Sequence, residues 1–177
     1  MAQLQRVNAE QQKGAIKKVE DEQQQYLTFV LAGEVFAIDI LHIKEIIEYG
    51  HLTAVPMMPE FIRGVINLRG SVVPVVDLSV RFGRQGTAVN RRTCFVIVEI
   101  DTADGLLDIG VMVDAVQAVL EIPASDIEPA PAFGAKIRTD FINGMGKVAG
   151  NFVIILALDR VLSVEEFVKM ERVTGEY

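Results

Sequence analysis

The chain carries one short sequence pattern twice. Residues 61–64 (Phe-Ile-Arg-Gly) match residues 141–144 (Phe-Ile-Asn-Gly), 80 positions later, and the same offset aligns Gly70 with Gly150. Chance can supply one match between strings rich in Val and Ile. It does not readily supply several in the same order with glycines at matching turns. The sequence therefore predicts an internal duplication of one small unit.

A second offset extends the duplication. With a shift of 73 positions, residues 37–40 align with 110–113, and Ile43 aligns with Val116. Each copy then contains a hairpin, a crossing strand, a proline-containing loop, a second hairpin and a short helix. That order gives about five short strands, which is the size of an SH3-like barrel. One copy alone would be a marginal domain, so we expect the two to share an apolar seam.

We therefore expect a mainly β fold in which two SH3-like five-stranded β-barrel subdomains pack side by side, with short helices and a C-terminal helix. The first subdomain is expected at 26–89 and the second, with the C-terminal helix, at 90–168, so that 26–168 form a single domain. Residues 1–25 are rich in Gln, Glu and Lys and are expected to form a flexible tail.

Local patterns place the elements. Runs of β-branched and aromatic residues predict strands at 26–31, 35–38, 64–68, 72–76, 93–100, 106–113 and 116–122, and a hairpin over 142–158. Residues 39–49 have mixed periodicity, which leaves both a short helix and a strand open. Asp77 is expected to cap a short helix ending at Phe82, and Asp159 to open a final helix with an apolar stripe. The stripe consists of Val161, Leu162, Val164, Phe167 and Val168.

Composition excludes several classes of function. Half of the residues are hydrophobic, but only 7% are aromatic and there is no Trp, so a core of Val, Ile and Leu is expected. The net charge of −7 argues against nucleic acid and against an anionic membrane surface as partners. No apolar run has the length of a signal peptide or a membrane span, so we expect a soluble, cytoplasmic protein without membrane insertion.

The sequence offers little for catalysis. The two histidines, His42 and His51, do not lie at metal-ligand spacing from each other or from the single cysteine, Cys94. His42 is expected to be partly buried, and Cys94, inside an apolar run, to be a buried small hydrophobe. Residues 144–147 (Gly-Met-Gly-Lys) lack the first glycine and the Ser or Thr of a phosphate-binding loop. We therefore expect no enzyme activity, no metal and no cofactor.

Three segments resemble the CheW family of bacterial chemotaxis coupling proteins. They are residues 36–41 (Phe-Ala-Ile-Asp-Ile-Leu), residues 59–70 (Pro-Glu-Phe-Ile-Arg-Gly-Val-Ile-Asn-Leu-Arg-Gly) and residues 73–78 (Val-Pro-Val-Val-Asp-Leu). The resemblance runs from about Tyr26 to Phe167. It implies a double SH3-like barrel without enzymatic activity, which links the signalling tip of methyl-accepting chemoreceptors to the regulatory domain of the histidine kinase CheA. It also implies recruitment to membrane-bound receptor arrays, and we expect a monomer when the chain is free.

The resemblance also implies a receptor-binding surface. Its residues are Ile43, Glu45, Gly64, Asn67, Arg69 and Val119. Ile43 is suited to apolar contact with a helix of the receptor tip, and Arg69 on a tight turn can offer its planar fork to a carboxylate. Without the resemblance, Arg69 reads as a solvated turn residue, Glu45 as an exposed strand residue and Asn67 as a residue that stabilises a turn.

Two alternative functions stay open. One is a CheW-like paralogue that serves another chemosensory pathway, such as surface motility. The other is a β-barrel that binds a small molecule in its apolar seam.

Overall fold

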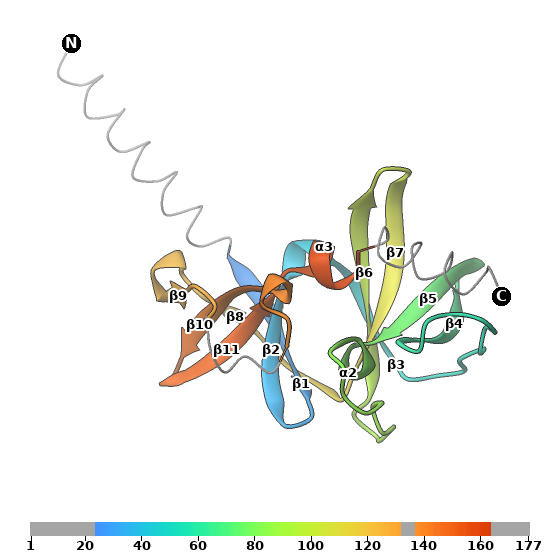
Figure 1. Ribbon diagram of the computed structural model, residues 1–177, viewed down its shortest axis with the longest axis horizontal. Coiled ribbons are helices and arrows are strands. Elements are labelled where there is room, and N and C mark those ends of the chain that lie inside the picture. The colour runs from blue at the N-terminus through green and yellow to red at the C-terminus, as the bar shows by residue number, and fades with distance from the viewer. Residues whose placement is uncertain (1–23, 132–136, 164–177) are drawn as a thin grey trace, which may run out of the picture.

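The computed structural model describes residues 24–131 and 137–163, and these residues form a mainly β protein, as predicted (Figure 1). One sheet contains, in spatial order, β8 (Ala115–Glu121), β1 (Gln25–Leu31), β2 (Glu34–Asp39), β11 (Asn151–Leu156), β10 (Ile142–Val148) and β9 (Ile127–Glu128). The other contains β3 (Ile43–Glu48), β6 (Cys94–Thr102), β7 (Gly105–Val113), β5 (Ser71–Asp77) and β4 (Ile62–Leu68). The six-stranded and five-stranded sheets lie side by side and fit the expected pair of SH3-like barrels.

Short helical turns connect the strands. They are η1 (Ile40–His42), α2 (Leu78–Arg81), η2 (Ala124–Asp126), η3 (Thr139–Phe141) and α3 (Leu158–Val161). The ambiguous stretch 39–49 thus contains both structures that the pattern left open, a single helical turn followed by β3. Asp77 caps α2 as predicted, because its Oδ1 accepts from the backbone N–H of Ser79. The last helix begins at Leu158 after Ala157, one residue before Asp159, where it was expected to open.

Parts of two predictions fall outside the described residues. The expected tail covers residues 1–25, of which 1–23 are not described and Gln25 already belongs to β1. In the apolar stripe, Val161 and Leu162 are buried, whereas Val164, Phe167 and Val168 lie outside the described residues.

The two copies exchange their first hairpins. The β1–β2 hairpin of the first copy pairs with strands of the second copy, antiparallel to β8 and parallel to β11. Correspondingly, the β6–β7 hairpin of the second copy pairs with β3 and β5 of the first. Sheet membership therefore does not follow the expected boundary between residues 26–89 and 90–168. Each sheet contains strands from both ranges.

The duplication predicted from the sequence extends to fine detail. A register shift between Ile62 and Gly64 recurs between Ile142 and Gly144. The hairpin turns repeat as well, with φ angles of 53° and 87° at residues 69 and 70 and of 49° and 82° at residues 149 and 150. The second hairpins of the two copies therefore fold alike, although each pairs with the first hairpin of the other copy.

A shared apolar core joins the two sheets, as the expected seam requires. The largest cluster of buried residues contains Phe29 and Phe36 of the six-stranded sheet together with Val96 and Val98 of the five-stranded sheet. Phe82, just after α2, places its ring centroid 5.6 Å from that of Phe36. Burial of this continuous surface makes the two barrels one packing unit.

A buried carboxylate anchors the segment that leads from α2 to β6. Asp77 has no exposed surface, and its carboxylate accepts hydrogen bonds from the backbone N–H and the hydroxyl of Thr87 at 2.9 and 3.0 Å. Arg63 lies 3.7 Å from the same carboxylate. The segment between α2 and β6 is therefore tied to the end of β5. Within the described ranges, no helix is long and apolar enough to cross a membrane.

Candidate protein-binding surface

Five of the six predicted receptor-binding residues lie in the five-stranded sheet. Ile43 and Glu45 are on β3, Gly64 and Asn67 are on β4, and Arg69 is in the turn between β4 and β5. β3 and β4 are the two edges of this sheet in strand order, yet two contacts bring the edges together. One is the ion pair between Arg69 in the β4–β5 turn and Glu45 on β3, and the other is a β-bridge between Val65 on β4 and Thr53 in the segment that follows β3. These contacts close the sheet into a barrel and gather the predicted residues.

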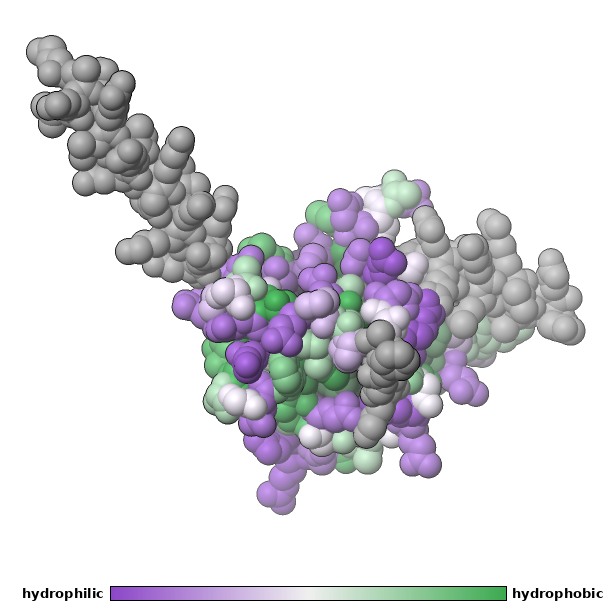
Figure 2. Space-filling model, turned by 60° about the vertical axis from the view of Figure 1, so that its left-hand side comes forward, coloured by the Kyte–Doolittle hydropathy of each residue, from purple (hydrophilic) through white to green (hydrophobic). Residues whose placement is uncertain are grey.

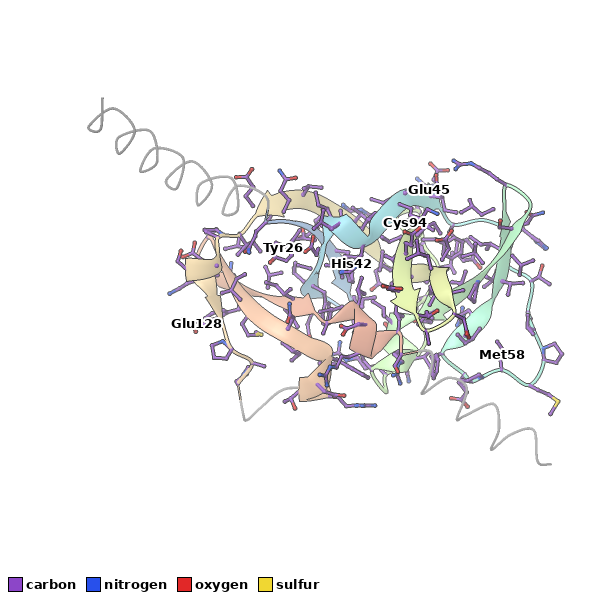
Figure 3. The ribbon with its side chains drawn as sticks, turned by 90° about the horizontal axis from the view of Figure 1, so that it is seen from above. Tyr26, His42, Glu45, Met58, Cys94 and Glu128 are labelled. Atoms are coloured by element: carbon purple, nitrogen blue, oxygen red, sulfur yellow. The ribbon has the colours of Figure 1, made fainter. Side chains whose placement is uncertain are left out.

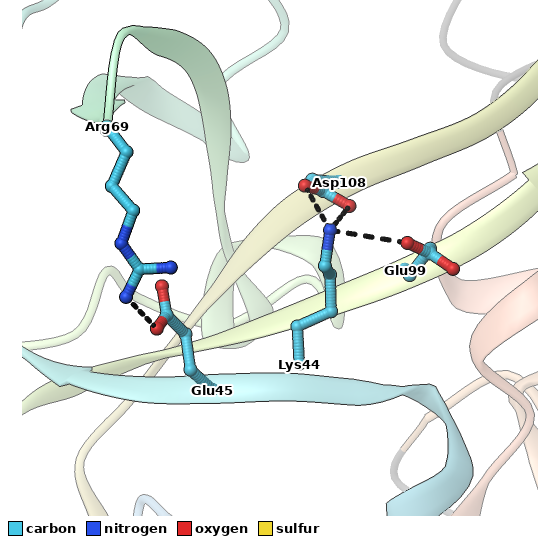
Figure 4. Close-up of polar contacts among 5 residues, drawn as sticks. All are labelled: Lys44, Glu45, Arg69, Glu99 and Asp108. Carbon is cyan, nitrogen blue, oxygen red and sulfur yellow. Dashed lines mark hydrogen bonds and ion pairs between the residues drawn. The ribbon is translucent and has the colours of Figure 1, made fainter.

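Arg69 and Glu45 form an ion pair on this surface (Figure 4). The Arg69 guanidinium donates to Glu45 Oε2 at 2.8 Å, with 80% of the Arg69 side chain and 24% of the Glu45 side chain exposed. The turn that carries Arg69 is fixed because Asn67 Oδ1 accepts from the backbone N–H of Gly70 at 2.9 Å. Arg69 therefore projects from a defined turn with most of its side chain open to solvent, and Asn67 stabilises that turn.

A second charge cluster lies beside the first and was not found from the sequence. Lys44 on β3 donates to both carboxylate oxygens of Asp108 on β7, at 3.2 and 3.0 Å, and lies 3.3 Å from Glu99 on β6. The hydrogen bond to Asp108, followed by that to Glu99, raises the pKa of Lys44 above its ordinary value. Because the cluster joins three strands that are distant in sequence, only the strand register could have revealed it.

Gly64 has a structural role in the fold besides the predicted contact with the receptor. A Cβ at this position would lie 2.3 Å from the backbone oxygen of Thr53, and the φ angle of Gly64 is 152°. Glycine is therefore required so that the segment around Thr53 can bridge to Val65. Contact of Gly64 with a receptor helix stays a prediction.

Large apolar side chains are exposed on β3, just before it and on β8. Ile43 is half-buried against the core, whereas Leu41 and Ile46 are 82% and 45% exposed, and neither of these two was singled out in the sequence. Val119 on β8 is 55% exposed and is the 73-residue counterpart of Ile46. Figures 1 and 3 place β3 and β8 on one side of the molecule, the far side in Figure 1 and the upper side in Figure 3.

Apolar exposure also occurs on the six-stranded sheet. Figure 2, which turns this sheet toward the viewer, shows apolar residues (green) between polar ones (purple). Phe152 on β11 is 50% exposed, and its 80-residue counterpart Val72 on β5 is 73% exposed. The two equivalent hairpins thus each expose one large apolar side chain.

The described residues present contacts suited to protein binding rather than a constellation of reactive groups. No group of three or more His, Cys, Asp or Glu side chains that could hold a metal occurs among them. His42 is exposed and not partly buried as expected, because it ends the short turn η1 at the surface. Cys94 is buried as predicted, and burial raises the pKa of its thiol. An exposed ion pair beside apolar side chains can instead recognise the polar and apolar stripes of a helix.

Known proteins share both this sequence and this fold. The family model of the CheW-like domain matches residues 25–166. The chemotaxis protein CheW of Klebsiella aerogenes is 35% identical over 154 residues, covering 87% of this chain and 90% of the relative. The scaffolding protein TtCheW of Thermoanaerobacter tengcongensis has a crystal structure that superposes with a TM-score of 0.71 at 36% identity, covering 78% of this chain and 86% of the other. Protein FrzA of Myxococcus xanthus is 31% identical over 130 residues, covering 73% of this chain and 78% of FrzA.

Proposed function

The chain belongs to the CheW-like family of chemotaxis scaffold proteins, and on that premise we propose that it couples the signalling tip of chemoreceptors to the histidine kinase CheA without catalysing a reaction itself. In this role it acts in the cytoplasm and is recruited to receptor arrays at the membrane. It binds the receptor tip through one surface and the regulatory domain of the kinase through others, and thereby supports array assembly and control of the kinase.

The Arg69–Glu45 pair is the observation that carries the receptor half of the proposal. Arg69 projects from a fixed turn toward Glu45 on β3, and 80% of the Arg69 side chain remains exposed. A receptor carboxylate or a helix carbonyl can therefore reach the guanidinium while Glu45 holds it in place. Ile43 and Ile46 on the neighbouring strand supply apolar contacts of the kind that an amphipathic helix needs.

A binding measurement with matched charge reversals tests this surface. We expect Arg69→Glu to weaken binding of a soluble receptor-tip fragment by at least about tenfold, because it removes the donor and adds repulsion. Lys147→Glu is the control, since Lys147 is also exposed and lies at the position of the other hairpin that corresponds to Asn67. It makes the same change in net charge and is expected to leave receptor affinity unchanged. Both variants should keep a free energy of unfolding within about 1 kcal/mol of the wild type.

A double variant separates the ion pair from the contact with the receptor. Glu45→Arg combined with Arg69→Glu restores an internal ion pair with its polarity reversed. We expect the double variant to remain deficient in receptor binding, because the receptor meets the wrong charge. Recovery of wild-type affinity in the double variant would show that Arg69 serves only the internal pair, and the assignment of the surface would then be wrong.

The match to FrzA favours a second candidate function. FrzA does not carry the chemotaxis protein CheW name of the Klebsiella relative, yet it shares 31% identity with this chain. The chain can therefore serve a chemosensory pathway other than flagellar chemotaxis, with the same coupling role but different receptors. Affinity measured against receptor tips from each pathway of the source cell distinguishes the two, since the cognate tip should bind most tightly.

A further inference from the structure

Arg81 is a buried cation at the junction of the two barrels. It ends α2, which follows β5 of the five-stranded sheet, and only 9% of its surface is exposed. Figure 1 shows α2 and α3 in the middle of the molecule, between the two sheets. Burying a guanidinium is unfavourable unless its surroundings compensate for the lost water. Its contacts therefore indicate what this position is built to do.

Those contacts come from both copies of the repeat. Nε of Arg81 donates to the backbone oxygen of Val161, at the end of α3, at 2.8 Å. The guanidinium carbon lies 5.0 Å from the ring centroid of Phe61 and 4.8 Å from that of Phe141. Phe61 and Phe141 are equivalent residues of the two copies, each just before the first strand of its second hairpin. One side chain thus contacts matching positions in both barrels.

The reciprocal exchange of hairpins relates the two copies by an approximate two-fold axis, and the hydrogen bond between Arg81 and Val161 lies near that axis. Val161 is itself the 80-residue counterpart of Arg81. Two equivalent positions can touch each other only near the pseudo-two-fold axis, so the contact is central to the junction. Because the second copy has Val where the first has Arg, the junction contains this polar contact once. The duplicated halves have kept their packing but differ at this position.

Arg84, in the segment after α2, makes a second polar contact across the junction, because it donates to the partly exposed carboxylate of Glu34 on β2 at 3.2 Å. The other connections leave the angle between the barrels less constrained. The chain crosses between the sheets at η1 (Ile40–His42) and at Asp114, which lies between β7 and β8. The apolar seam holds the barrels together, but burial of apolar surface is non-directional and permits neighbouring packings of similar energy. A hydrogen bond with a fixed acceptor and two ring contacts are directional, and buried polar groups can select one packing among several.

We propose that Arg81 is a positioning residue that fixes the angle between the two barrels. It does not touch a partner in this role. It sets the placement of the surface around Arg69 and Glu45 relative to the six-stranded sheet, and so lets receptor and kinase occupy the chain together. We call the contacts of Arg81 with Val161, Phe61 and Phe141 the clamp. The clamp is a property of the free chain, whereas its effect on simultaneous binding of receptor and kinase rests on the proposed coupling function.

A distance measurement tests the clamp on the full chain. Spin labels are placed by Val72→Cys and Phe152→Cys, exposed positions in opposite sheets, after Cys94→Ala removes the single native thiol. In this background we expect Arg81→Met, which retains an unbranched side chain, to broaden or shift the inter-barrel distance distribution. Arg160→Met is the matched control, because Arg160 is exposed on the equivalent helix α3, and should leave the distribution unchanged. An unchanged distribution in Arg81→Met overturns the proposal.

Arg81→Lys provides a second variant if Arg81→Met does not fold. A lysine retains the cation near the two rings but lacks the planar fork and the Nε donor. We expect it to fold and to broaden the distribution to a lesser degree. A distribution identical to that of the wild type in a folded Arg81→Lys variant contradicts the clamp.

Binding measurements test the consequence of the clamp. For Arg81→Met or Arg81→Lys, we expect near-normal affinity for the receptor tip alone and for the kinase domain alone. In the wild type, bound receptor tip should raise the affinity for the kinase domain, and in the variants this increase should be smaller by about fivefold or more. Equal enhancement in the variant and the wild type contradicts the consequence even if the distances change. Failure of the wild type to bind either partner refutes the proposed function instead, and the distance measurement still decides the clamp.

Discussion

At the scale of single residues, buried polar groups have the most specific roles in this fold. Asp77 combines two roles, because its carboxylate caps α2 and also accepts both the backbone N–H and the hydroxyl of Thr87. The sequence predicted the cap from an Asp before a short apolar helix. It did not predict the contacts with Thr87, because a bond across ten positions of a polar loop leaves no periodic signal.

Replacement of Asp77 should therefore be far more damaging than replacement of an exposed aspartate. We expect Asp77→Ala to lower the free energy of unfolding by about 3 kcal/mol, because it leaves the Thr87 and Ser79 donors unsatisfied and Arg63 without its nearby carboxylate. Urea unfolding measures this loss, and hydrogen exchange at the amide of Thr87 should accelerate beyond the change in global stability. Asp159→Ala, on the exposed face of α3, should change the free energy by less than about 0.5 kcal/mol. Equal losses in the two variants would contradict the anchoring role of Asp77.

At the scale of elements, the sequence predicted most strands but not their partners. The apolar runs placed strands that correspond to β1, β2, β4, β5, β6, β7 and β8, and the glycines located the turns of the two later hairpins. The exchange of the β1–β2 and β6–β7 hairpins could not be predicted, because both copies contain the same local pattern. Pairing within a copy and pairing between copies therefore fit the sequence equally well.

Equivalent glycines in the two copies offer a direct comparison at this scale. Gly64→Ala places a methyl group 2.3 Å from the backbone oxygen of Thr53, whereas Gly144→Ala meets the Cγ2 methyl of Ile127 at 2.6 Å and the backbone oxygen of Glu128 at 3.3 Å. The side chain of Ile127 can shift and the bridged backbone of Thr53 cannot, and of the two glycines only Gly64 has a positive φ angle, 152°. We expect losses in the free energy of unfolding of about 3 kcal/mol for Gly64→Ala and about 1 kcal/mol for Gly144→Ala. The reverse order in denaturant unfolding would show that the approach of Thr53 is not what requires glycine at position 64.

At the scale of the whole molecule, the site depends on contacts that the sequence alone does not display. The family resemblance brought Glu45 and Arg69 into one predicted surface, but their ion pair joins residues 24 positions apart and depends on closure of the five-stranded sheet. Leu41 and Ile46 were not predicted to be exposed, because apolar residues in a short run are ordinarily assigned to the core. Their exposure extends the surface that we propose for receptor binding.

We propose that one chain holds two partners at once. Co-sedimentation of the kinase CheA with assembled receptor tips, measured as the concentration of this chain is varied, tests this proposal directly. We expect kinase recruitment to rise as the chain is added, and to fall again at large excess, when separate copies of the chain saturate each partner. The Arg69→Glu variant should recruit less kinase throughout, and the Lys147→Glu variant should match the wild type. Kinase sedimentation that is the same with and without the chain, at every ratio tested, would contradict the coupling function.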